Sequence, residues 1–80
     1  MKIAVTGATG LLGNATAKHL LAQGHEVIAV DRRAGEIAPG HPVIVGDLTD
    51  LSFCDSFMQG VGAVIHLAAI PNPKIGRAHV

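Results

Sequence analysis

The sequence contains one cysteine and no tyrosine, and it has no excess of charge of either sign. The single cysteine, Cys54, excludes an internal disulfide and a cysteine-rich metal site. Six basic and six acidic side chains give a formal net charge of zero. The chain therefore lacks the basic field that holds nucleic acid or an anionic membrane. The only adjacent basic pair, Arg32-Arg33, is too small to follow a phosphate backbone.

Long hydrophobic segments are also missing. No run approaches the ~20 apolar residues of a membrane span. The stretch from Ile3 to Leu12 is interrupted by glycines and lacks the cleavage site of a signal peptide. We therefore expect a soluble, cytoplasmic protein with no membrane partner.

The histidines do not predict a metal site. They are scattered over different expected elements without ligand spacing and without a nearby cysteine: His19, His25, His41 and His66. We interpret His66, at the end of an expected strand, as a packed or capping residue. Cys54 is interpreted as a small buried hydrophobic side chain.

The composition that remains favours a buried parallel sheet. Apolar residues make up 49% of the 80 residues, and ten glycines allow tight turns between elements. A complete domain of this kind usually has about 150 residues, so we expect an incomplete one.

Apolar runs and turn residues predict alternating strands and helices. Strands are expected over residues 2–6, 26–30, 42–45 and 63–67, helices over 11–23 and 51–59, and a loop over 32–41. Gly24 and Gly60 are positioned to end the helices, and Thr49 or Asp50 to cap the second. Alternation implies an α/β fold with right-handed crossovers, and we expect strand order 3-2-1-4 with helices on both faces.

Three glycines follow the first expected strand and open the first expected helix: Gly7, Gly10 and Gly13. Backbone N–H groups and the positive end of the helix dipole favour a pyrophosphate there. Glycine lets phosphate oxygens approach the main chain, and Gly13 allows close helix–sheet packing. A tight turn without a ligand is the alternative. A triphosphate P-loop is excluded because no glycine precedes a lysine.

Asp31 ends the second expected strand, where an acidic side chain meets the adenosine ribose in dinucleotide-binding folds. Its carboxylate would accept bonds from the ribose hydroxyls and repel a 2′-phosphate, which favours NAD. Arg32 and Arg33 point towards NADP instead, because guanidinium groups pair with phosphate. As solvated loop charges they would have no such role. Asp31 and the two arginines taken together favour NAD over NADP as the cofactor.

These features resemble the N-terminal part of the extended short-chain dehydrogenase/reductase family, the NAD-dependent epimerase/dehydratase group. Four motifs carry the resemblance: Thr6–Gly13, Asp31, Gly46–Leu48 and His66–Ala69. It covers residues 1 to about 73 and implies a partial Rossmann fold with a parallel sheet of about four strands.

The resemblance also implies roles for individual residues. Asp47 would bind the adenine amino group beside the Leu48 backbone, and the small residues after the fourth strand would line the pyrophosphate and nicotinamide ribose. Asp47 could instead be a turn residue, and the alanines could be strand-end packing. The expected cofactor-binding set is Gly7, Gly10, Leu11, Leu12, Gly13, Asp31, Arg32, Asp47, Leu48, Leu67, Ala68 and Ala69.

Catalysis in the family uses Tyr-x-x-x-Lys with a nearby serine or threonine, and this chain has no tyrosine. We therefore expect no catalytic residue here, only the cofactor-binding portion of an NAD(P)-dependent oxidoreductase, epimerase or dehydratase. The full-length parent would act on a sugar nucleotide or related hydroxyl compound, and a homodimeric parent stays open. The alternatives are a non-catalytic NAD(P)-binding sensor and a truncated product without function.

The last residues fit no expected element. Back-translation of Lys74–Val80 with the codons AAG ATC GGA AGA GCA CAC GTC reproduces a common sequencing-adapter sequence. Our hypothesis is that residues 1–73 form an incomplete NAD(P)-binding Rossmann domain and that residues 74–80 are a non-native tail.

Overall fold

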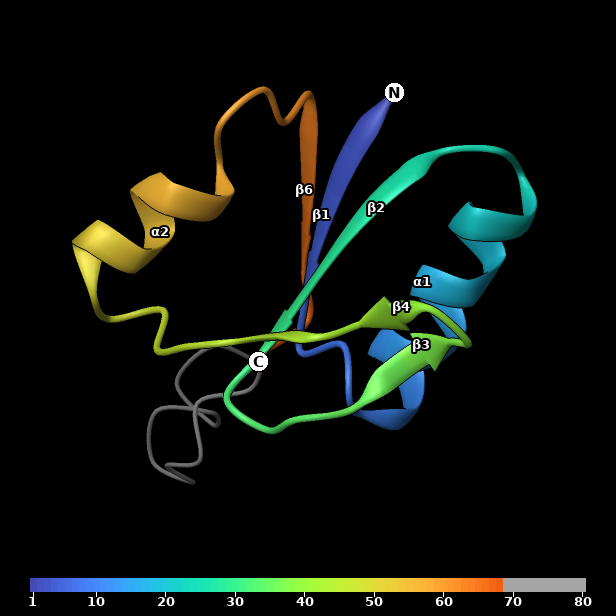
Figure 1. The fold of residues 1–80 in the computed structure, drawn as a ribbon, viewed down its shortest axis with the longest axis horizontal. Helices are drawn as coiled ribbons and strands as arrows, with labels where there is room; N and C mark the ends of the chain where they lie inside the picture. The colour runs from blue at the N-terminus through green and yellow to red at the C-terminus, as the bar shows by residue number, and fades with distance from the viewer. Residues whose placement is uncertain (69–80) are drawn as a thin grey trace, which may run out of the picture.

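Four short apolar segments form a parallel sheet in the computed structural model, which describes residues 1–68. The spatial order is β5-β2-β1-β6 (Figure 1), and this confirms the expected order 3-2-1-4. The strands are β1 (Lys2–Thr6), β2 (Glu26–Asp31), β5 (Ile44–Val45) and β6 (Ala63–His66). Ala69 and the expected tail over 74–80 lie outside the described residues.

The register brings the carboxyl ends of three strands to one edge of the sheet. Thr6, the last residue of β1, pairs with Val30 of β2 and with His66 of β6. The chain leaves β1 towards one neighbour and returns through the other, so this edge is the topological switch point of the sheet.

One helix covers each face of the sheet (Figure 1). Ala17 of α1 (Leu11–Ala22) packs with Ile3, Val5 and Ala29, and α2 (Leu51–Phe57) packs with Ala4 and Val30. Alternate residues of β1 therefore point to opposite faces, as the two-residue period of a strand requires. No helix within residues 1–68 is long and apolar enough to cross a membrane.

The helix ends follow local rules. After α1, Gly24 has φ 88°, its N–H donates to the Leu21 carbonyl, and the His25 N–H donates to the Leu20 carbonyl. These are the two bonds of a Schellman motif. Asp50 caps α2 by accepting from the Ser52 N–H at 2.9 Å. The prediction for α2 was too long, because the helix ends at Phe57 rather than at residue 59.

The expected loop over 32–41 is wrong in part. It contains β3 (Glu36–Ala38), which pairs antiparallel with β4 (His41–Pro42) in a separate two-stranded sheet beside α1. Gly40, with φ 80°, makes the turn between them. Ile37 is 1% exposed and packs in the core on the α1 side, which holds the hairpin in place. Because only one residue of β3 is buried, the sequence shows no alternating apolar pattern from which the strand could be predicted.

The expected strand over 42–45 is also corrected, because the structure divides it. Pro42 belongs to β4, whereas Ile44 and Val45 pair with β2 as β5. Val43 between them is buried and donates its N–H to the Gly35 carbonyl at 2.8 Å. One apolar run thus serves two sheets.

Candidate functional site

The turn after β1 requires glycine at its first position. Gly7 has φ 69°, a left-handed conformation that L side chains rarely adopt. A methyl group there would lie 2.7 Å from the carbonyl carbon and oxygen of Leu67 and 2.8 Å from the Ala68 nitrogen. The absence of a side chain therefore lets the β1 turn approach the segment that follows β6.

The start of α1 offers free hydrogen-bond donors. A Cβ at Gly13 would collide with the Gly7 carbonyl oxygen, so glycine allows the helix to begin directly against the turn. Gly10 is the N-cap and contributes no side chain, and the first bond into the helix comes from the Asn14 N–H to the Gly10 carbonyl. Within residues 1–68, the N–H groups of residues 11–13 have no partner. Such donors at a helix N-terminus bind anions.

Thr6 joins β1 to the turn after β6 through its side chain. Its hydroxyl lies 2.7 Å from His66 Nδ1 and accepts from the N–H groups of Leu67 and Ala68 at 3.1 and 3.3 Å. Thr6 is buried, so these bonds hold the two strand ends together at the switch point. His66 was interpreted as a packed or capping residue. It is exposed overall, and its ring nitrogen Nδ1 contacts the Thr6 hydroxyl.

Asp31 is held at the end of β2 by three donors. Its Oδ2 accepts from the Thr9 N–H and from the Thr9 hydroxyl, both at 2.9 Å, and its Oδ1 accepts from the Arg33 N–H at 3.2 Å. Partial burial raises the pKa of Asp31, but the bonds from Thr9 and then Arg33 outweigh it and bring the pKa below its ordinary value of 3.8. The carboxylate is therefore ionised at neutral pH.

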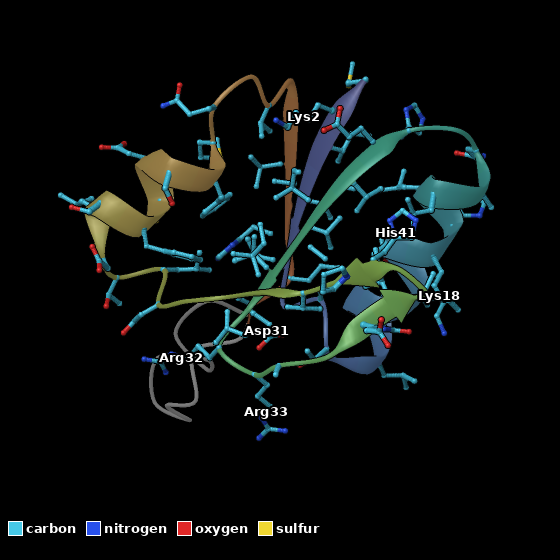
Figure 2. All side chains as sticks on the ribbon, viewed as in Figure 1. Lys2, Lys18, Asp31, Arg32, Arg33 and His41 are labelled. Carbon is cyan, nitrogen blue, oxygen red and sulfur yellow. The ribbon has the colours of Figure 1, made fainter. Side chains whose placement is uncertain are left out.

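Asp47 lines the same cavity as Asp31 and also carries a negative charge that is held by hydrogen bonds. Its Oδ1 accepts from the Thr49 N–H and hydroxyl at 2.9 and 2.8 Å, and its Oδ2 accepts from the Arg32 guanidinium at 3.2 Å. The Thr49 N–H, then the Thr49 hydroxyl, then Arg32 lower the pKa of Asp47. Figure 2 shows Asp31, Arg32 and Arg33 together where β2 ends.

These groups surround one open cavity of about 680 Å³, within the ~300–1,000 Å³ of small-molecule sites. Of the residues expected to bind the cofactor, the structure brings together Gly7, Gly10, Asp31, Arg32, Asp47, Leu48, Leu67 and Ala68. Leu11, Leu12 and Gly13 do not line the cavity, and the side chains of Leu11 and Leu12 are exposed. Ala69 lies outside the described residues.

Four residues line the cavity that were not in the expected set: Thr9, Arg33, Thr49 and His66. Arg33 was weighed only as a phosphate partner or a loop charge, and Thr49 only as a helix cap. The Asp47–Leu48–Thr49 order gave a local signal, because aspartate often binds backbone two residues on. Thr9 gave no such signal, because its partner is 22 residues away.

A second hollow of about 780 Å³ lies between α1 and the β3–β4 hairpin. Lys18, Glu36 and His41 are its only charged or titratable lining residues among the described part of the chain. It lacks the glycine turn and the convergent strand ends that line the first cavity. We therefore assign the candidate site to the cavity at the switch point.

A parallel sheet with helices on both faces and a glycine turn at its switch point defines the Rossmann class of nucleotide-binding folds. The sequence model of the NAD dependent epimerase/dehydratase family matches residues 3–77. The chain belongs to this family. The NAD dependence of the family agrees with the cofactor that is expected from the glycine turn and Asp31.

A solved structure supports both the fold and the family. A short-chain dehydrogenase/reductase superfamily protein from Agrobacterium tumefaciens, with bound NAD, superposes with a TM-score of 0.77 at 32% identity. The match covers 98% of this chain and 24% of that protein. The expected fold class and the resemblance stated from the four motifs are thereby confirmed.

Two relatives have different activities at the same identity. A 3 beta-hydroxysteroid dehydrogenase/Delta 5→4-isomerase of Mycobacterium tuberculosis is 38% identical over 72 residues, which is 86% of this chain and 19% of that protein. An L-arabinose 1-dehydrogenase (NAD(P)(+)) of Haloferax volcanii is also 38% identical over 72 residues, 90% of this chain and 27% of that protein. The chain thus spans less than a third of the length of either relative.

Proposed function

We propose that this chain is the NAD-binding part of an oxidoreductase, epimerase or dehydratase. One observation carries the proposal: Gly7 and Gly10 of the turn that opens α1 line the same cavity at the switch point as the fixed Asp31 carboxylate. The first would bind the pyrophosphate and the second the adenosine ribose. A pyrophosphate needs donors and a ribose needs an acceptor, so the pair suits a dinucleotide.

The remaining lining residues fit the rest of the cofactor. Asp47 would accept from the adenine amino group, because its Oδ2 has only the Arg32 bond in the structure and can accept another. The backbone of Leu48 lies beside it. The segment of Leu67 and Ala68, held by Thr6, would run along the pyrophosphate and the nicotinamide ribose.

Binding of NAD to the 80-residue chain tests the proposal. Titration calorimetry with NAD and with NADP compares the parent, Asp31→Ala, and Asp55→Ala as a control that removes the same charge from α2. We expect the parent to prefer NAD, Asp31→Ala to weaken NAD binding about 10-fold or more, and Asp55→Ala to match the parent. A parent that binds no NAD, or one whose two affinities are unchanged by Asp31→Ala, would contradict it.

We propose further that the whole protein acts on a hydroxyl compound such as a sugar nucleotide. The two relatives are dehydrogenases named for a hydroxysteroid and for a sugar, at equal identity to this chain. Equal similarity to enzymes with such different substrates supports a role for this segment in holding the cofactor rather than in choosing the substrate. With no tyrosine in the chain, the 80 residues should bind NAD without forming NADH from any alcohol.

We also propose residues 1–73 as the cofactor-binding unit and residues 74–80 as a segment without a role in binding. A chain that ends at Pro73 should bind NAD within about twofold of the 80-residue chain, because every residue of the expected cofactor-binding set comes before residue 74. A chain with residues 74–80 in scrambled order keeps the composition and serves as the control. A loss of binding in both variants would show that the native order of these residues matters.

A further inference from the structure

Thr9 is bonded to Asp31 twice, and both bonds go to the same oxygen. The Thr9 N–H and hydroxyl each lie 2.9 Å from Asp31 Oδ2. Thr9 belongs to the glycine turn and Asp31 ends β2, so the two bonds tie the phosphate end of the candidate site to its ribose end. The Thr9 methyl lies beside Gly35, where an added Cβ would be only 3.3 Å from it.

The acceptor capacity of Asp31 is nearly used. Each carboxylate oxygen can accept about two hydrogen bonds. Thr9 fills both places on Oδ2, and the Arg33 N–H fills one on Oδ1 at 3.2 Å. One place therefore remains, on Oδ1. The carboxylate cannot rotate without breaking bonds at 2.9 Å, so its charge is fixed in position.

The Arg32 guanidinium is bonded to the second carboxylate rather than to Asp31. Arg32 donates to Asp47 Oδ2 at 3.2 Å, so this guanidinium is paired with Asp47. A 2′-phosphate placed beside Asp31 would meet a fixed negative charge with no free donor from Arg32. A ribose hydroxyl would meet the remaining acceptor place.

We propose that Thr9 is a positioning residue that sets cofactor choice: its hydroxyl holds the Asp31 carboxylate in the orientation that favours NAD and disfavours NADP. This inference rests on the proposed NAD site. Without the hydroxyl, the backbone N–H of Thr9 remains as a single bond, and the carboxylate can turn away from a 2′-phosphate. Removal of the hydroxyl should therefore lower discrimination more than it lowers overall binding.

Two variants of Thr9 separate the hydroxyl from the rest of the side chain. Thr9→Val keeps the shape and removes the hydroxyl, whereas Thr9→Ser keeps the hydroxyl and removes the methyl. We expect the ratio of the NADP and NAD dissociation constants to fall about 3- to 10-fold in Thr9→Val, since hydrogen bonds to charged groups are the stronger ones. Thr9→Ser should keep the ratio of the parent within about twofold.

A second measurement needs no cofactor. Carbon-13 NMR titration of the Asp31 carboxyl should show a higher pKa in Thr9→Val than in the parent, because the hydroxyl bond lowers that pKa. Thr9→Ser should keep the parent's pKa. The same spectra report whether each variant is folded.

The outcomes separate this inference from the proposed function. If the parent binds no NAD, the proposed function fails. If Asp31→Ala lowers the ratio of the NADP and NAD dissociation constants and a folded Thr9→Val does not, the proposed function stands and the role of Thr9 is overturned. An equal loss of both cofactors in Thr9→Val would also overturn it, because a residue that only maintains the turn would act on both alike.

Discussion

The buried hydroxyl of Thr6 uses all of its hydrogen-bonding capacity. A hydroxyl has one proton and two acceptor places. The N–H groups of Leu67 and Ala68 fill the acceptor places, at 3.1 and 3.3 Å, so the hydroxyl proton must go to His66 Nδ1 at 2.7 Å. His66 Nδ1 is therefore an acceptor, and neutral His66 carries its proton on Nε2.

The tautomer of His66 can be measured directly. Nitrogen-15 NMR of the neutral ring should show the pattern of an Nε2–H tautomer with little exchange to the other form. Thr6→Val removes the donor and keeps the shape, so the preference should weaken in that variant. An Nδ1–H tautomer in the parent would mean that Thr6 does not donate to the ring.

The Asp31 carboxylate predicts a loss of stability in acid. Its pKa in the folded chain lies below the ordinary value of 3.8, so its contribution is complete above that value and is lost as pH falls through the lowered pKa. Asp31→Asn keeps an acceptor for the Thr9 N–H but carries no charge. The variant should therefore be less stable than the parent at neutral pH, and the difference should vanish in acid.

Urea unfolding in sucrose, which strengthens burial, gives the free energy of unfolding of both chains. The difference between parent and Asp31→Asn should be largest near neutral pH and should shrink as pH falls below 3.8 through the lowered pKa of Asp31. A difference that stays constant across this range would show that the charge of Asp31 contributes nothing.

Residues with local signals were predictable, and residues with distant partners were not. The glycines and Asp31 were expected because a turn and a strand end are visible in the sequence. Thr9 was missed because its role depends on a carboxylate that only the fold brings near. The bond of Arg32 to Asp47 was missed for the same reason, since these residues follow two different strands.

At the level of elements, the strand and helix ends were predictable where one residue fixes them. Gly24 and Asp50 end and begin helices through bonds to their own neighbours. The run over 42–45 could not be divided in advance, because its residues are all apolar or β-compatible. Val43 is buried on the α1 side, and it lies at the point where the chain passes from the sheet of β4 to the sheet of β5.

Two glycines with similar positive φ angles allow a matched test of the turn. Gly7 and Gly40 have φ 69° and 80°, so alanine at either position carries a similar backbone strain. A Cβ at Gly40 meets nothing within 4 Å, whereas a Cβ at Gly7 meets the Leu67 carbonyl at 2.7 Å. Gly40→Ala should cost about 1 kcal/mol.

Gly7→Ala should cost at least about 2 kcal/mol more than Gly40→Ala, because backbone atoms must also move apart. Urea unfolding of both variants in sucrose measures the difference. An equal loss of unfolding free energy in the two variants would mean that the turn after β1 and the segment after β6 are not as close together as the structure shows.

At the scale of the whole molecule, the sheet has an open side within residues 1–68. The strand β6 pairs only with β1 there, and Val64 in its middle is 43% exposed. Unpaired strand edges with apolar side chains promote pairing with another chain. We therefore expect the 80-residue chain to self-associate through β6.

Two substitutions distinguish strand pairing at the β6 edge from non-specific hydrophobic association. Val64→Lys places a charge on β6, and Leu51→Lys makes the same kind of change on α2, where the side chain is 80% exposed. Sedimentation velocity over a range of concentrations should show a much larger reduction of self-association for Val64→Lys, because edge lysines oppose strand pairing. Equal effects would point to net charge rather than to the edge. A parent chain that stays monomeric at every concentration would show that β6 is already protected.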